Sequence, residues 1–180
     1  MTAVPRVARL RALATLLVLG ALPAPCRAAN EIRHAGDALQ IVIPAGALGL
    51  SLHRHDGQGS RELLESVALT TAITVGLKLG VHEERPSGGM HSFPSGHTAL
   101  AFCGAEYLQH RYGPRWGVPA LVLATFVGYS RVESKEHWTH DVVAGAAIGV
   151  AGARALTRSG WTVAPSVASG TLAIGLAGVF

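Results

Sequence analysis

Hydrophobic residues gather in five segments along the chain, and polar stretches that contain glycine or proline separate them. The segments lie at residues 38–53, 62–81, 97–110, 117–131 and 141–156. Each is long enough for several helical turns and longer than a typical strand. The stretches between them carry turn signals such as "HDGQGS", "RPSGG" and "RYGP". The pattern therefore predicts an all-α protein, a bundle of about five core helices.

The first 28 residues have the order of a secretory signal peptide. Three arginines precede an apolar run at 13–22, and the small-residue, helix-breaking stretch "PAPCRAAN" follows it. We expect cleavage after Ala28 or Ala29, with an uncleaved membrane anchor as the alternative. The predicted organisation is a signal peptide at 1–28, a helical domain at 29–160 and a tail at 161–180. The tail is rich in Val and Thr and is broken by "ASG", which favours two short strands.

Charge and cysteine content change once the leader is removed. The chain has 15 Lys and Arg against 11 Asp and Glu, and four of the arginines lie in the leader. The mature chain would thus be neutral, so the high isoelectric point gives no reason to expect a nucleic-acid partner. Cleavage would also remove Cys26 and leave Cys103 alone, which excludes an intrachain disulfide.

The composition and the placement of arginine indicate a membrane bundle. The chain has 22 glycines and only 14% charged residues, and small residues are common at helix contacts in membranes. Arginines concentrate in the turns at 53–61, 110–115 and 154–160, which the positive-inside rule places in the cytoplasm. The stretch "HSFPSGHT" at 91–98 would then face the periplasm. A soluble secreted helical domain is the alternative, because only the second segment reaches about 20 residues.

Three short motifs fall on the same predicted side of the bundle. They are "K-x6-RP" at 78–86, "PSGH" at 94–97 and "SR-x5-H-x3-D" at 130–141. Each alone fits a solvated helix end. Together they offer two arginines, a lysine, a helix N-terminus and two histidines. That set suits a bound phosphate, which needs donors for its oxygens, a nucleophile on one side and a proton source on the other.

This ordered set resembles the three signature motifs of the type 2 phosphatidic acid phosphatase superfamily, with every motif position filled over about residues 62–156. The superfamily also includes bacterial class A acid phosphatases and vanadium haloperoxidases. The resemblance implies a helical bundle and phosphate ester hydrolysis that requires no metal and no organic cofactor. Many members are integral membrane lipid phosphatases.

The resemblance also implies roles for the catalytic residues. His137 would attack phosphorus and become a phosphohistidine, and Asp141 would accept the ring N–H of His137 and orient it. His97 would protonate the leaving oxygen and then activate the water that hydrolyses the intermediate.

The same resemblance implies a group of phosphate-binding residues. They are Lys78, Arg85, Arg131, Ser95 and Gly96, with Gly96 contributing its amide.

Other polar side chains near the motifs have plainer interpretations. His91 and His140 could join the two motif histidines around a metal, but the sequence holds no set of ligands at recognised zinc spacing, so we expect no metal site. The run His82 to Glu84 lies at variable positions of the first motif and is interpreted as solvated loop, with contact to a lipid headgroup as the alternative.

The resulting hypothesis is a bacterial inner-membrane phosphatase whose periplasmic site removes phosphate from a lipid. Candidate substrates are phosphatidate, phosphatidylglycerol phosphate, an isoprenyl diphosphate and a lipid A phosphate. The alternatives are a soluble periplasmic acid phosphatase, a vanadate-dependent haloperoxidase and a non-catalytic phospholipid-binding module. The sequence indicates no oligomeric state.

Overall fold

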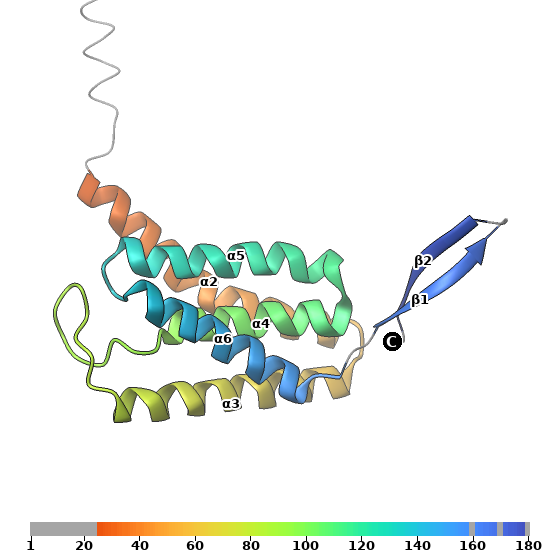
Figure 1. Cartoon of the computed structure of the whole chain (residues 1–180), viewed down its shortest axis with the longest axis horizontal. Coiled ribbons are helices and arrows are strands. Elements are labelled where there is room, and N and C mark those ends of the chain that lie inside the picture. The colour runs from red at the N-terminus through yellow and green to blue at the C-terminus, as the bar shows by residue number, and fades with distance from the viewer. Residues whose placement is uncertain (1–24, 159–160, 169–170, 179–180) are drawn as a thin grey trace, which may run out of the picture.

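The computed structural model describes residues 25–158, 161–168 and 171–178. Five helices form the bundle and two strands follow them (Figure 1). The elements are α2 (Pro25–His53), α3 (Gly57–Gly80), α4 (Gly96–Tyr112), α5 (Pro114–Glu133), α6 (Thr139–Leu156), β1 (Trp161–Ala168) and β2 (Thr171–Gly178). All five predicted apolar segments form helices, so the predicted all-α bundle is confirmed. The two strands pair in antiparallel register within the predicted tail.

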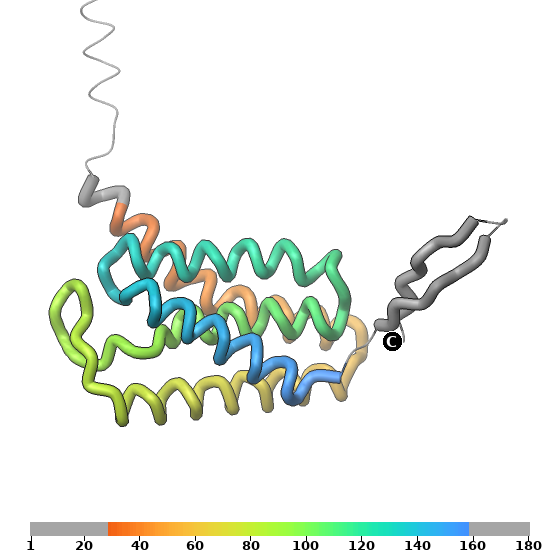
Figure 2. The backbone as a smooth tube through the Cα atoms, viewed as in Figure 1, coloured from red at the N-terminus to blue at the C-terminus, as the bar shows by residue number. Residues whose placement is uncertain are grey.

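Helix α4 lies at the centre of the bundle and packs against the other four helices (Figure 2). Its buried side chains are mostly small, and Tyr107 is its largest fully buried one. Leu63 of α3 and Val127 of α5 complete the core around it. Because α4 begins at the "PSGH" motif, the central helix also carries part of the candidate site.

Glycines let α6 approach α4 at backbone distance. A Cβ atom at Gly145 would lie 2.4 Å from the carbonyl oxygen of Ser95, and one at Gly149 would lie 2.3 Å from that of Ala99. Neither distance is compatible with a real side chain, so both positions require glycine at this helix separation. The contact at Gly145 fixes the start of α6 against the start of α4, where two of the three motifs lie.

Helix α2 begins at Pro25, whereas the apolar pattern predicts a start at residue 38. The prediction is wrong here because the polar stretch before residue 38 is helical and packs on the polar end of α5. A Cβ at Gly36 would lie 2.0 Å from Oγ of Ser130, which shows how closely the two helices approach. Apolar periodicity cannot detect a helix whose contacts are polar.

The other four helices begin one to five residues earlier than their apolar segments. Polar caps account for two of these starts: Asp56 accepts a hydrogen bond from the Gly59 amide at α3, and Ser95 accepts one from the Thr98 amide at α4. The predicted signal peptide falls largely on residues 1–24, outside the described residues, and stays a prediction.

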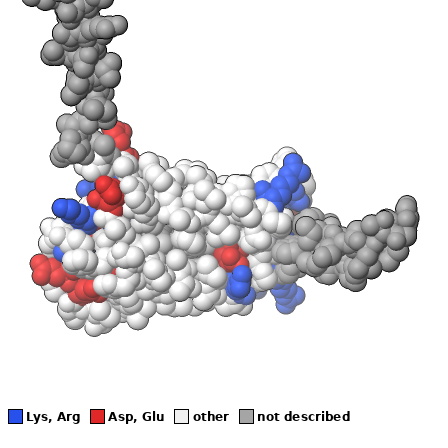
Figure 3. Space-filling model, turned by 45° about the horizontal axis from the view of Figure 1, so that its top comes forward, with Lys and Arg blue, Asp and Glu red and all other residues white. Residues whose placement is uncertain are grey.

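On the face shown in Figure 3, charged side chains gather toward the two ends of the bundle and the surface between them is largely uncharged. The segments Ala29–His53 and Gly57–Gly80 are long and apolar enough to cross a membrane. Large apolar side chains on α2, α3, α5 and α6 are exposed; examples are Val42, Leu64, Leu79, Val122 and Val143. An apolar belt of this kind suits a lipid environment.

A polar network closes the end of the bundle opposite the motifs. Asp56 accepts hydrogen bonds from Arg111 at 2.8 and 2.9 Å and from the hydroxyl of Tyr112 at 2.8 Å. Burial acts to raise the pKa of Asp56, but these hydrogen bonds and the charge of Arg111 outweigh it and lower the pKa to about 2. This network ties the start of α3 to the end of α4.

Candidate active site

The three motifs meet at one end of the bundle (Figure 1). The first runs from the end of α3 into the loop 81–95, the second opens α4, and the third runs from the end of α5 to the start of α6. The amide of Ser95 donates to the carbonyl oxygen of Asp141 at 3.0 Å, which joins the second motif directly to the third.

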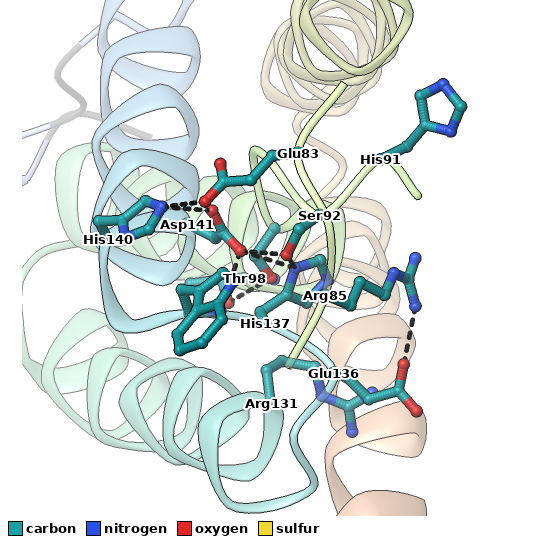
Figure 4. A network of polar contacts seen from close by, with 12 residues as sticks. Glu83, Arg85, His91, Ser92, Thr98, Arg131, Glu136, His137, His140 and Asp141 are labelled. Carbon is teal, nitrogen blue, oxygen red and sulfur yellow. Dashed lines mark hydrogen bonds and ion pairs between the residues drawn. The ribbon is translucent and has the colours of Figure 1, made fainter. Parts of the chain in front are cut away.

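His137 and Asp141 form a buried pair. Nδ1 of His137 lies 3.4 Å from Oδ2 of Asp141, and the two side chains are 4% and 0% exposed (Figure 4). They are four residues apart, across the start of α6, which brings them to the same side of the chain. With Nδ1 directed at the carboxylate, Nε2 of His137 is the ring nitrogen left for chemistry.

Asp141 is itself held in place from two directions. The amide of Trp138 donates to Oδ2 at 2.9 Å, and the hydroxyl of Ser92 makes a short hydrogen bond to the same oxygen. Oδ1 is fully buried without a hydrogen bond and lies 3.2 Å from Nε2 of His140 (Figure 4). The orientation of His137 therefore depends on a hydrogen bond from the loop before α4 as well as on the start of α6.

The pKa of His137 is lowered to about 4. Burial is the main cause, and the positive charges of Lys78 and Arg85 act in the same direction. The Asp141 carboxylate acts in the opposite direction but does not compensate. The ring is thus neutral at physiological pH, which is the form that a nucleophile requires.

The loop 81–95 folds over this pair. Gly88 and Gly89 adopt positive φ angles of 84° and 97°, and the amide of Arg85 donates to the carbonyl oxygen of Gly89 at 2.9 Å. Lys78 donates to the carbonyl oxygens of His91 and Ser92 at 3.0 and 3.2 Å. The lysine of the first motif therefore anchors the loop that carries Ser92.

Two carboxylates hold the arginines of the motifs. Nη1 of Arg85 donates to Glu136 at 2.7 Å (Figure 4), and Glu136 also lies 3.4 Å from Arg33. Nη1 of Arg131 donates to Asp37 at 2.7 Å, and Nη2 donates to the carbonyl oxygen of Arg33 at 2.7 Å. These bonds orient both guanidinium groups at the end of the bundle.

His97, on the first turn of α4, faces the same cluster. Its Nε2 lies 3.2 Å from Oδ1 of Asp37. His97, Gly96 and Lys78 also line a cavity of about 230 Å³ whose remaining walls, from α2, α3 and α4, are largely apolar. Ser95, in contrast, is fully buried and its hydroxyl contacts that of Thr98 at 2.9 Å. Ser95 thus serves the helix start, and its predicted phosphate contact remains a prediction.

The structure brings all eight predicted site residues to one end of the bundle and adds three that the motifs do not mark. The three are Asp37, Ser92 and Glu136. Ser92 and Glu136 lie beside motif residues in the sequence, so proximity to a motif was the available signal. Asp37 lies 41 positions before the first motif residue, and no feature of the sequence marked it as a site residue.

Side chains outside the predicted set also make contacts. Glu83 Oε1 lies 2.6 Å from His140 Nε2, so Glu83 is held rather than freely solvated. Glu83, His140 and Asp141 place three potential metal-ligand atoms within 4.8 Å of one another. This group differs from the four histidines considered on sequence grounds, and His91 is directed away from it (Figure 4).

The motifs, their order and this geometry agree with a known family. Residues 60–164 match the PAP2 superfamily. The chain belongs to the PAP2 superfamily. This confirms the resemblance, since the matched region covers more than half of the 180 residues and contains all three motifs.

Two curated relatives share part of the sequence. Over 97 residues the chain is 38% identical to a lipid A 1-phosphatase of Porphyromonas gingivalis. The aligned region covers 49% of this chain and 22% of that protein. The chain thus spans about a fifth of this relative. Over 156 residues it is 28% identical to a lipid A 4'-phosphatase of Helicobacter pylori, with 78% of each chain covered.

Two solved structures share the fold. LpxE of Aquifex aeolicus superposes with a TM-score of 0.64 at 24% identity, covering 77% of this chain and 89% of that one. A transmembrane PAP2-type phosphatidylglycerolphosphate phosphatase of Bacillus subtilis gives a TM-score of 0.56 at 24% identity, covering 84% and 85%. The helical bundle described here is therefore the PAP2 fold.

Proposed function

We propose that this protein is a membrane lipid phosphatase that hydrolyses a phosphate ester through a phosphohistidine intermediate. The observation that carries the proposal is the buried His137–Asp141 pair, with its ring kept neutral beside the cations of the three motifs. A protein that only bound phosphate would have no use for a neutral histidine oriented by a carboxylate.

In the first step, Nε2 of His137 attacks phosphorus while the bond from phosphorus to the leaving oxygen breaks. His97 gives its ring proton to that oxygen, so the dephosphorylated lipid leaves as an alcohol. In the second step, water attacks phosphorus, His97 takes a proton from the water, and the phosphorus–nitrogen bond breaks. Inorganic phosphate is released and both histidines return to their starting forms.

The cations of the motifs would stabilise the charge that develops on the phosphoryl oxygens. Lys78, Arg85 and Arg131 come from three separate segments and are held at the same end of the bundle. Donors that are fixed before the substrate arrives need no reorganisation during the reaction, and removal of one such donor typically costs about a hundredfold or more in rate.

The apolar cavity beside Lys78 and His97 supports a lipid as substrate. Its lining includes Val75 and Leu100, directly next to the polar site. A lipid phosphate has the matching arrangement, with a charged head group followed by an apolar tail. Lipid A phosphates are the first candidates, because the named relatives are lipid A phosphatases.

In the membrane topology that we propose, the site faces the periplasm. The turns rich in arginine lie at the opposite end of the bundle from the motifs, and the positive-inside rule assigns that end to the cytoplasm. A cleaved signal peptide at 1–28 remains part of this proposal.

The test is phosphate release by the purified protein in detergent with EDTA present. The substrates are lipid A, phosphatidate, phosphatidylglycerol phosphate and an isoprenyl diphosphate. The wild-type protein should release phosphate from at least one of them. His137→Ala should reduce release by at least about a thousandfold, because the nucleophile is lost.

His53→Ala is the matched control, since it removes a histidine from the opposite end of the bundle. It should keep wild-type activity. Wild-type turnover by the His137→Ala variant would refute the mechanism. Turnover of small phosphomonoesters alone, together with release of the protein by osmotic shock, would instead favour a soluble acid phosphatase.

A further inference from the structure

Asp37 is a carboxylate of α2 that contacts two functional groups of the candidate site at once. Its Oδ1 lies 2.7 Å from Nη1 of Arg131 and 3.2 Å from Nε2 of His97. One oxygen atom therefore joins an arginine that would bind phosphate to the histidine that would act as general acid.

Close packing of α2 on α5 places Asp37 there. The neighbouring Gly36 touches Ser130 and Arg131 so closely that an added Cβ would lie 2.0 Å from Oγ of Ser130 and 2.7 Å from Nη2 of Arg131. Arg131 is only 2% exposed and also donates to the carbonyl oxygen of Arg33 in α2. The backbone position of Asp37 is thus built into the helix contact, and its side chain, which is 37% exposed, reaches Arg131 and His97 from there.

The charged groups around His97 come from several elements of the bundle. Burial lowers the pKa of His97 and Arg131 of α5 acts in the same direction, while Asp37 of α2 and Glu136 of the α5–α6 loop act against them without outweighing them. Lys78 of α3 lines the same cavity. Among the described residues that interact with His97, Asp37 is the acid in direct contact with a ring nitrogen.

The contact with Asp37 mirrors the contact between His137 and Asp141. In His137 the carboxylate lies at Nδ1 and leaves Nε2 for attack, whereas in His97 the carboxylate lies at Nε2 and leaves Nδ1. A carboxylate that accepts one ring N–H fixes the orientation of the imidazole and favours its protonated form. A general acid needs both effects.

We propose that Asp37 is the positioning residue of His97, so that the site contains two histidine–aspartate pairs, one for the nucleophile and one for the acid. This inference rests on the proposed function. It assigns Asp37 no contact with the reacting atoms. Asp37 acts by holding His97 so that the Nδ1 proton reaches the leaving oxygen as the bond to phosphorus breaks.

The experiment compares two leaving groups in the Asp37→Asn variant. Dodecyl phosphate releases an alkoxide, which needs a proton, whereas 4-nitrophenyl phosphate releases a phenolate that leaves without one. We expect kcat/KM for dodecyl phosphate to fall by about 10- to 100-fold, within the range of general acid catalysis. The value for 4-nitrophenyl phosphate should fall by less than about threefold, because its departure needs no acid.

The ratio of the two values is the decisive quantity, because the fraction of folded enzyme cancels from it. His97→Gln should change the ratio in the same direction, and the double variant should lose no more than His97→Gln alone, since both residues act in one step. Asp37→Glu should restore part of the ratio. Glu31→Gln removes an exposed carboxylate from the same helix and should leave the ratio unchanged.

Each other outcome overturns the assignment. An unchanged ratio in Asp37→Asn means that His97 does not depend on this carboxylate. An equal loss on both substrates means that Asp37 acts on phosphate binding through Arg131 or on folding. If the wild-type protein hydrolyses neither these substrates nor any lipid phosphate, the proposed function fails and the role of Asp37 fails with it. Wild-type activity with an unchanged ratio removes the role of Asp37 alone.

Discussion

Single side chains at this site act through neighbours that lie far away in the chain. His137 is oriented by Asp141, Asp141 is held by Ser92, and Ser92 is part of a loop that Lys78 anchors. The first contact lies within the third motif, and the other two join motif residues to the loop before α4. The chemistry of one imidazole is therefore set by at least three separate segments.

The low pKa of His137 leads to a prediction about pH. Its folded value of about 4 lies below the ordinary value of 6.5, so the ring stays neutral from neutral pH down to about pH 5 and takes up a proton only near pH 4. We expect the ring resonances of 15N-labelled His137, assigned by their loss in His137→Gln, to keep neutral shifts at pH 5. An ordinary titration near pH 6.5 would contradict the burial and the charges described here.

Lys78→Gln is the matched variant for this measurement. It removes a positive charge that lowers the pKa of His137, so the ring should take up its proton at higher pH than in the wild-type protein. An Arg115→Gln variant removes an exposed arginine from the opposite end and should leave the titration unchanged.

The residues that carry the chemistry could be predicted from the sequence because their types and spacing form motifs. Asp37 could not be predicted, because it contacts Arg131 and His97 only through the packing of α2 on α5. Its neighbours in the sequence are polar, and a helix that makes polar contacts leaves no apolar repeat. The burial of Ser95 could not be predicted from the sequence either, because a serine that caps a helix and a serine that binds phosphate have the same sequence signature.

At the scale of helices, the bundle depends on close contacts made by glycine. Gly145 and Gly149 bring α6 against α4, and α4 in turn contacts every other helix. The number of helices follows from the apolar segments. The distance between the helices cannot be predicted from the sequence, because the glycine content suggests close packing but does not indicate which glycines lie at a contact.

Gly149→Ala should destabilise the protein by roughly 1–3 kcal/mol, the usual cost of overpacking a tight core. The added Cβ would meet the Ala99 carbonyl oxygen at 2.3 Å and the Cys103 amide nitrogen at 2.9 Å. Both are backbone atoms of α4 that cannot rotate away, so the two helices must separate. Thermal unfolding in detergent measures the effect.

Gly76→Ala provides the control for this substitution. Gly76 lies in α3, and a Cβ added there meets no atom within 4 Å. This variant should be unchanged or more stable by up to about 1 kcal/mol, because alanine favours a helix. Equal stability of the two alanine variants would show that α6 has room to move.

On the scale of the whole molecule, two polar networks occupy opposite ends of the bundle. The motifs and their carboxylate partners lie at one end, and the Asp56–Arg111 network lies at the other. The uncharged belt between them matches the interior of a bilayer (Figure 3). The overall architecture could be predicted from apolar segments and charge placement, whereas the depth of each helix in the membrane depends on the folded surface.

The proposed topology predicts which end of the protein an external reagent can reach. Ser87 lies in the loop of the active-site end and His55 lies in the turn between α2 and α3, and both are exposed. In a background without Cys26 and Cys103, a membrane-impermeant maleimide should label Ser87→Cys in intact spheroplasts. His55→Cys should be labelled only after lysis. The reverse pattern would place the candidate site in the cytoplasm.

The cavity beside His97 is a suitable target for an inhibitor. The cavity of about 230 Å³ places an apolar wall, which includes Val75 and Leu100, next to the cations of the motifs. A phosphonate with a short aliphatic chain would match both halves, and its carbon–phosphorus bond would resist cleavage. The chain length at which potency stops rising would then measure how far the cavity extends.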